Sequence, residues 1–406
     1  MVVAAGFLIL QVWAAPSVSP ANDTYRYAQL ALRVLGESKQ AAQVNALRAY
    51  CEDNAAWLAR RQQVDPGSFA AAYRRDEAVS RCVRDSPHGL HPTSPRYDAI
   101  FDSRIGLPIL AAPLVSVIGV NQALKATSVL LSALGGTIAY LILRILGLRR
   151  PPSLLGQGIY YTGPIGWWGS FGLTDGPTVT TSMATLLGAI LLLRHRYRLG
   201  TTLVIISIGA GCFIRHSNFI FITGAVLAAA GAALRTDPRH RRPLLIIAAL
   251  SAVGLVGLVA TAHALHWSGP SDTLQDTFTH HFTRPDVTNP WQRLAGLNLQ
   301  YWSQWTQEQV RDPWPVAAAA IGSVTLVRRH RTFGPIAVAA VLGLPLLAYP
   351  RLNTPTEQPP DRLVPPARTG SQRRAAEDTA QAIDSGAGPQ PRRLERRPRH
   401  RCHRPT

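Results

Sequence analysis

Two acidic residues, Asp23 and Asp175, lie where a membrane protein could do chemistry. Asp23 follows the apolar start of the chain, and Asp175 precedes the apolar run Pro177–Leu193. A carboxylate at a membrane face can accept a proton from a hydroxyl group within hydrogen-bond reach. The same positions also suit helix starts, because Asp23 belongs to a good N-cap sequence and Asp175 is followed closely by a proline. A catalytic pair and two helix starts both remain open interpretations.

Arg215 and His216 interrupt two apolar blocks, 201–214 and 217–234. An ionisable residue at the edge of a membrane span is a candidate for function. A guanidinium group such as that of Arg215 can hold a lipid phosphate through two parallel hydrogen bonds. The alternative is a short turn whose long side chains reach towards water.

The elements that must position these residues are apolar runs of roughly 15 to 22 residues, the length that a helix needs to cross about 30 Å of hydrocarbon. They recur from Ile105 to Tyr349, and one more run opens the chain. The pattern predicts an all-α polytopic membrane protein with roughly nine or ten transmembrane helices. The predicted spans are Val2–Ala15, Ile105–Leu124, Thr127–Leu148, Leu154–Gly169, Pro177–Leu193, Thr201–Ile214, Ser217–Leu234, Leu244–Leu265, Pro315–Val327 and Phe333–Tyr349.

The net charge of +19 arises from arginine clusters between apolar blocks and in the tail. No basic stripe with interleaved aromatic residues is present, so the sequence does not indicate a nucleic-acid-binding protein. The positive-inside tendency instead predicts that Arg194–Arg198, Arg235–Arg242 and Arg328–Arg331 face the cytoplasm. Counting every span as a crossing places Arg149–Arg150 outside, against that tendency. Either one apolar run does not cross, or these two arginines face outward, where they could bind an anionic lipid head group.

This topology divides the chain into four parts. Residues 1–15 form a first transmembrane helix, 16–104 a large external loop with interfacial helices, and 105–349 a transmembrane bundle with a tryptophan-rich external loop at 266–314. The tail 350–406 is predicted to be disordered and basic, and an altered reading frame is an alternative origin for it. Cys51 and Cys82 lie in the external loop, so a disulfide between them is expected; two unpaired cysteines are the alternative.

Phosphate loops, nucleophile elbows, zinc-protease motifs and paired CxxC motifs are all missing from the sequence. A metal-ligand spacing is missing as well, so the identity of any metal stays unknown. Arg104 and Asp102, at the start of the span that begins at Ile105, are predicted to form a local ion pair. Chemistry must therefore come from acids at the membrane face.

Three short stretches carry a family resemblance: Asn22-Asp23-Thr24-Tyr25-Arg26-Tyr27, then Pro95-Arg96-Tyr97 through Phe101-Asp102-Ser103-Arg104-Ile105-Gly106-Leu107-Pro108, then Gly169-Ser170-Phe171-Gly172-Leu173-Thr174-Asp175. With a long external first loop, they resemble the GT-C superfamily of polyprenyl-phosphate-sugar-dependent membrane glycosyltransferases. Within that superfamily they look similar to integral membrane proteins of actinobacteria. The resemblance covers roughly Met1 to Tyr349, and its motifs are short and degenerate.

The resemblance implies transfer of a sugar from a polyprenyl-phosphate donor to a cell-envelope acceptor, at the outer face of a plasma membrane. It implies that Asp23 is the catalytic carboxylate and that Asp175 binds the acceptor or a metal. Arg215 and His216, placed by their position between apolar blocks, would bind the lipid phosphate. A divalent cation is the one cofactor that the resemblance allows. The partners would be the lipid bilayer and the sugar donor, with no nucleic acid. A transporter or lipid flippase, or an inactive truncated gene product, is the alternative.

Overall fold

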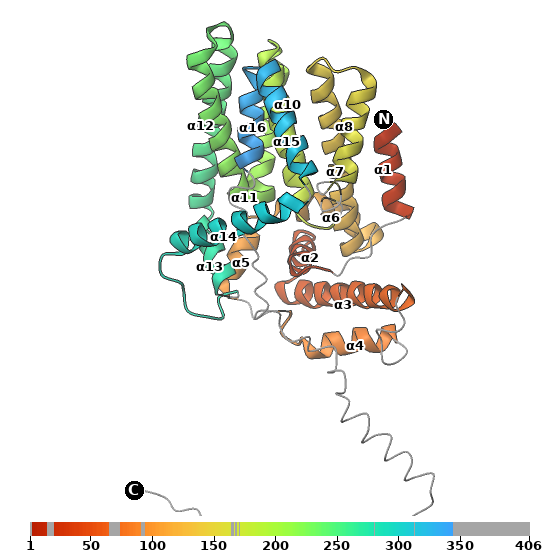
Figure 1. Cartoon of the computed structure of the whole chain (residues 1–406). Helices are drawn as coiled ribbons and strands as arrows, with labels where there is room; N and C mark the ends of the chain where they lie inside the picture. Colours follow the sequence, from red (N-terminus) through yellow and green to blue (C-terminus); the bar gives the residue numbers. More distant parts are fainter. Residues whose placement is uncertain are drawn as a thin grey trace, which may run out of the picture. The chain divides into compact units, whose positions relative to one another are not determined.

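A computed structural model describes residues 2–13, 20–64, 74–90, 94–163, 166, 169, 171–279, 281–311 and 313–343. Every regular element within these ranges is a helix. Four helices, α7 (Val120–Ile145), α10 (Asp175–Leu193), α11 (Tyr197–Thr236) and the one that ends at Ala264, are long and apolar enough to cross a membrane. A fifth candidate span is added if the helices Pro95–Asp102 and Gly106–Ile118, which are bent by 79° from each other, are counted as one span. The chain is therefore an all-α multi-pass membrane protein (Figure 1).

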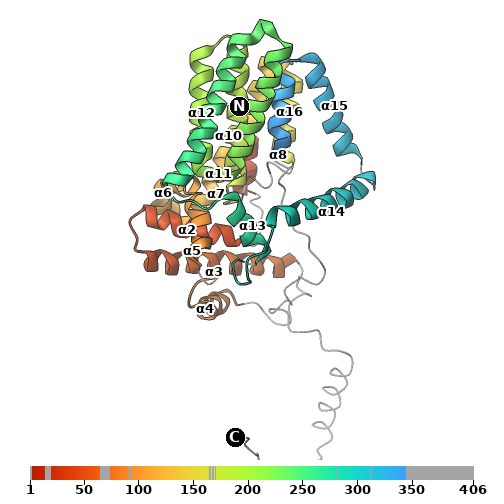
Figure 2. The ribbon, with the colours of Figure 1, turned by 90° about the vertical axis from the view of Figure 1, so that its left-hand side faces the viewer.

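Four helices outside the apolar bundle form what we call the polar layer: α2 (Asn22–Val34), α3 (Lys39–Val64), α4 (Arg75–Asp85) and α5 (Pro95–Asp102). Helix α2 lies between the bundle and α3, and α4 lies on the far side of α3 (Figures 1 and 2). Eight consecutive residues of α2, Tyr25 to Leu32, are buried. The segment was expected to lie on the membrane surface, but α2 is enclosed between α3 on one side and α6 and α7 on the other.

Helix α11 explains part of the difference between the four long apolar helices and the nine or ten spans predicted. Arg215 has non-helical angles (φ −158°, ψ 75°) inside it. A straight helix of 40 residues would hold its ends about 60 Å apart. Instead the rings of His195 and His240, which flank the two ends, lie 6.4 Å apart, and a side chain added at Gly211 would meet the ring of Phe219 at 2.4 Å. Helix α11 is therefore a hairpin of two antiparallel limbs, 197–214 and 216–236.

Helix α6 (Gly106–Ile118) is shorter than the span predicted at Ile105–Leu124 and counts as a candidate span only together with α5. It bends by 79° from α5. Its start packs against the backbone of Phe213, beside the α11 break. Just past its end, Asn121 Nδ2 donates a hydrogen bond to the carbonyl of Ala49 in α3, at 2.7 Å. Both ends of α6 therefore lie beside the polar layer.

The position of α6, with both ends beside the polar layer, bears on the conflict over Arg149–Arg150. Helix α7 starts beside the polar layer and runs to the opposite face, where Arg194 Nη2 donates to the carbonyl of Ile145 at 2.9 Å. The pair Arg149–Arg150 follows directly and opens α8 (Arg150–Thr162). These arginines therefore lie on the face that carries Arg194–Arg198, which we call the basic face. With this arrangement Arg149–Arg150 lie on the same face as the other arginine clusters, in agreement with the positive-inside tendency.

The bundle is packed through glycines. Side chains added at Gly135 and Gly136 of α7 would overlap Tyr160 and Tyr161 of α8, and Tyr161 donates a 2.6 Å hydrogen bond to the carbonyl of Ala133. Small residues are common where membrane helices approach closely, because lipid gives helices little hydrophobic reason to associate. Helix α1 (Val2–Trp13) packs against α8 in a different way, because the ring of Phe7 stacks on the ring of Tyr161 with centroids 4.4 Å apart.

The loop predicted to be external at 266–314 is mostly helical in its described residues. It contains α13 (Pro270–Phe278) and α14 (Pro290–Arg311), which follow the span α12 (Arg241–Ala264) and its leading 3-10 turn η2 (Pro238–His240). Two shorter helices, α15 (Trp314–Arg329) and α16 (Phe333–Gly343), close the described part. Thr332, between them, donates a hydrogen bond to Asp237, which puts the Arg328–Arg331 turn on the basic face. The predicted disordered tail lies outside the described residues.

Candidate functional site

Four separate segments bring charged side chains together where the polar layer meets the bundle. Asp23 and Tyr27 come from the start of α2, and Arg104 comes from the turn between α5 and α6. Asp175 is the first residue of α10, and Arg215 stands at the break in α11. We call these five residues the charge cluster. Asp175 and Arg215, which the sequence singled out, belong to it together with Asp23.

The first ion pair of the cluster joins Arg104 to Asp23. Arg104 Nη1 lies 3.5 Å from Asp23 Oδ2. The arginine side chain is 12% exposed and the carboxylate 44%, so the carboxylate stays accessible while its partner is held. The guanidinium group also lies over the ring of Phe101, at 5.2 Å. The local pair predicted between Arg104 and Asp102 is wrong, because the arginine turns to an acid 81 positions away.

The second ion pair joins Arg215 to Asp175. Arg215 Nη1 lies 2.5 Å from Asp175 Oδ1, with exposures of 27% and 47%. The non-helical backbone at Arg215 ends one limb of the α11 hairpin and lets the side chain leave the helix beside the start of α10. Both pairs therefore combine a half-exposed carboxylate with a more enclosed guanidinium group.

Tyr27 links the two halves of the cluster. Its hydroxyl group lies 3.2 Å from Thr174 Oγ1, next to Asp175 in sequence, and it is one helical turn from Asp23. Burial raises the pKa of Tyr27, although the positive charge of Arg104 acts in the opposite direction. Because burial disfavours the phenolate, the hydroxyl group stays protonated and can donate a hydrogen bond.

His216 is not part of the cluster. Its side chain is buried, and Nε2 donates to the carbonyl of Leu258 in α12 at 3.0 Å. Its ring packs at an angle against Trp267, with centroids 5.5 Å apart. The histidine therefore connects the α11 break to α12, and it does not face the ion pair of its neighbour Arg215.

The two predicted disulfide cysteines lie in the polar layer, away from the cluster. Cys51 of α3 and Cys82 of α4 are joined by a disulfide, with their Cα atoms 5.8 Å apart. The bond fastens the outermost helix of the layer to α3. The disulfide helps to fix the shape of the layer, and its sulfur atoms do not act as acid or base.

The cluster suits an anion better than a cation. Each carboxylate already faces an arginine, and guanidinium groups match phosphate geometry well. Divalent cations such as Mg²⁺ prefer several oxygen ligands, and within the described ranges no three His, Cys, Asp or Glu residues gather to supply them. We therefore assign no step to a divalent cation.

Two members of the cluster, Tyr27 and Arg104, were not singled out for function by the sequence. Tyr27 carries a signal, because it lies four positions after Asp23 on a helix and so shares its face. Arg104 carries a weaker one, as a charge directly before an apolar run. Its pairing with Asp23 depends on how α6 packs under the bundle and has no local signature.

Comparison with protein-family models, with curated proteins and with solved structures finds no match to this chain. The class that the fold defines is an all-α multi-pass membrane protein with a polar helical layer on one face. The charge cluster is the feature of that face on which a proposal about function can rest.

Proposed function

We propose that this protein is a membrane glycosyltransferase, which transfers a sugar from a polyprenyl-phosphate donor to a cell-envelope acceptor at the outer face of a plasma membrane. The observation that carries the proposal is the charge cluster: two half-exposed carboxylates, each beside an arginine, drawn from four chain segments. Such a site can accept a proton and hold a phosphate at the same time. The resemblance of the three short motifs to the GT-C superfamily points in the same direction.

In this reaction Asp23 accepts the proton of an acceptor hydroxyl group. The hydroxyl oxygen bonds to the anomeric carbon of the sugar, while the bond from that carbon to the phosphate oxygen breaks. Polyprenyl phosphate leaves with the bonding electron pair. Arg104 and Arg215 offer guanidinium groups for the charge that grows on the phosphate. Asp175 holds Arg215 in place through their ion pair. Its carboxylate also binds the acceptor.

Charge and redox chemistry both support an outer-face location for the polar layer. The basic face carries Arg149–Arg150 and Arg194–Arg198, and positive residues favour the cytoplasmic side. The polar layer then lies outside, where its disulfide between Cys51 and Cys82 is stable. A lipid-linked donor needs no nucleotide-binding fold, which agrees with a chain whose described elements are helices alone.

A lipid flippase is the second candidate, because broken helices are typical of transporters. The break at Arg215 is the observation in its favour. Transporter breaks, however, lie near the bilayer midplane, whereas Arg215 lies at the junction with the polar layer. This position favours a site at the membrane face.

The decisive experiment measures sugar transfer from radiolabelled polyprenyl-phosphate donors in membranes that contain the wild type or Asp23→Asn at equal levels. Loss of a general base lowers rates by about 10²- to 10⁴-fold, so transfer by Asp23→Asn should fall at least 100-fold. Asp76→Asn, in the exposed helix α4, is the matched control and should transfer at the wild-type rate. Equal transfer by Asp23→Asn and wild type, or no transfer by wild type from any donor, would overturn the proposal.

A further inference from the structure

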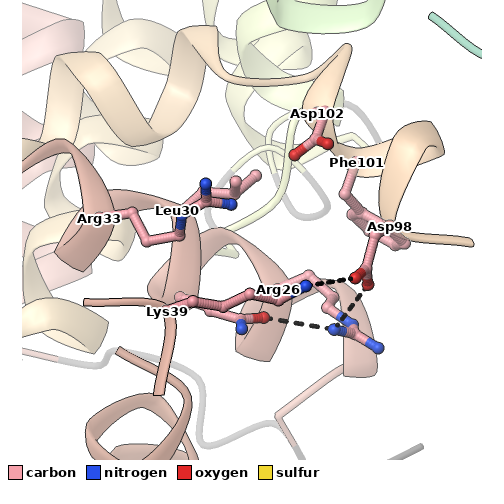
Figure 3. Close-up of a pocket in the computed structure, with 8 residues that line it drawn as sticks. Arg26, Leu30, Arg33, Lys39, Asp98, Phe101 and Asp102 are labelled. Atoms are coloured by element: carbon pink, nitrogen blue, oxygen red, sulfur yellow. Dashed lines mark hydrogen bonds and ion pairs between the residues drawn. The ribbon is translucent and has the colours of Figure 1, made fainter. Parts of the chain in front are cut away.

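A pocket of about 210 Å³ opens between α2, the start of α3 and α5. Three of its lining residues are basic, Arg26, Arg33 and Lys39, and two are acidic, Asp98 and Asp102. Figure 3 shows Asp98 joined to Arg26 and to Lys39, while Arg33 and Asp102 stand apart from these contacts. The pocket therefore has more positive than negative charge.

Arg26 gives the pocket a buried positive charge at its base. Its residue is 3% exposed, and its guanidinium carbon lies 4.9 Å from the centre of the Tyr97 ring. Within the described part of the chain, Nη1 bonds to Gln29 and Asp98 but Nε and Nη2 have no hydrogen-bond partner. Aromatic rings attract a cation without accepting its protons as oxygen does. The charge of Arg26 is thus incompletely neutralised.

The carboxylate that pairs with Arg26 is shared. Asp98 Oδ1 lies 3.3 Å from Arg26, and Asp98 Oδ2 lies 3.3 Å from Lys39 Nζ. Lys39 is 63% exposed, so it can turn towards a ligand at the mouth of the pocket. Arg33 is also exposed there. Two exposed cations at the mouth and one buried cation at the base favour an anion with several acceptor oxygens.

We infer that this pocket binds a phosphoryl group. A phosphoryl group has three acceptor oxygens and can be held by Arg33 and Lys39 together, since guanidinium and ammonium groups both bind phosphate strongly. The enclosed Arg26 acts through its field, because its free nitrogens are covered. The helices that line the pocket, α2, α3 and α5, belong to the layer next to the bundle (Figure 1), so the group comes either from a lipid head group or from a solute. The inference does not depend on sugar transfer.

The test uses the full-length protein in phosphatidylcholine nanodiscs and measures binding of inorganic phosphate by calorimetry. The wild type should bind, and the double variant Arg33→Gln/Lys39→Gln should bind at least 10-fold more weakly. Arg81→Gln/Arg84→Gln removes the same charge from a separate groove on α4 and is the matched control. Because Arg33 and Lys39 are exposed, the variant should fold.

A second arm separates the two sources of the phosphoryl group. Phosphatidylglycerol is added to the nanodiscs, and phosphate binding is measured again. Loss of phosphate binding identifies a lipid head group as the occupant, and unchanged binding identifies a solute. Failure of the wild type to bind phosphate or retain phosphatidylglycerol, or equal binding by the pocket and control variants, would overturn the inference. Sugar transfer is measured separately, so either proposal can fail alone.

Discussion

The polar layer and the apolar bundle are held together by different forces. In the layer, a disulfide joins α3 to α4, and charged side chains join α2 to α5. In the bundle, glycines let helices approach until aromatic rings touch the backbone, as at Gly136 and Gly211. The layer shares an apolar core with α6 and α7, and the disulfide and ion pairs add covalent and charged links to it. The bundle meets lipid, where close packing has to replace the hydrophobic effect. The charge cluster lies at the boundary between these two regions.

Removing the disulfide should have the largest effect, and only on the layer. Cys51→Ser/Cys82→Ser is expected to destabilise the polar layer by about 3 kcal/mol, because the bond closes a loop of some thirty residues. Hydrogen exchange should accelerate in α3 and α4 and stay slow in α10 and α12. Cys212→Ser, at the free cysteine of the bundle, is the control. Equal acceleration in both regions would show that the two are one cooperative unit.

Removing the ion pair between Arg104 and Asp23, at the boundary of the two regions, should have the next largest effect. Arg104→Gln leaves Asp23 without its partner, and we expect a loss of about 2 kcal/mol, between the values for exposed and buried pairs. The measurement is the free energy of unfolding in detergent. Arg74→Gln removes a fully exposed pair with Glu77 and should change stability by less than about 0.5 kcal/mol. Similar losses in both variants would contradict a structural role for the Asp23 pair.

Packing in the bundle gives a smaller effect with a close control. Gly211→Ala forces a methyl group into the ring of Phe219, and after the gain in helix propensity the net loss should be about 1 kcal/mol. Gly209→Ala, on the same limb of α11, enters open space and should be neutral or slightly stabilising. Thermal midpoints of the two variants test this ordering. A reversed order would mean that the α11 hairpin is not packed through Gly211.

The smallest effect is a pH dependence at the basic face. Hydrogen bonds from Thr332 and His240 lower the pKa of Asp237, although burial acts against them. A lowered pKa in the folded state adds stability above the unfolded value of about 3.9, and this is lost as the pH falls through the folded pKa. We expect Thr332→Val to remove roughly 0.5 kcal/mol at pH 6 and less than that at pH 3. Thermal midpoints at both pH values check this, and an equal change at both would contradict it.

Sequence periodicity predicted the α-helical, multi-pass class and most of the helix positions, because apolar length is a local property. It did not predict the geometry at Ile105–Leu124, where the short helix α6 bends by 79° from α5 and both of its ends lie beside the polar layer. The predicted functional residues Asp23, Asp175 and Arg215 do meet in one cluster. His216 does not join them, because a histidine at the end of an apolar run can as well bond to a neighbouring helix.

By itself, the sequence determined where apolar runs begin and end, which face attracts arginines, and which cysteines stand outside the bundle. Each of these depends on residue types within one stretch of chain. The tertiary structure alone decided that α11 is a hairpin, that Arg104 turns to Asp23, and that Arg26 is buried with Asp98 as its only acidic partner among the described residues. These contacts join residues far apart in sequence, and their geometry follows from how whole helices pack.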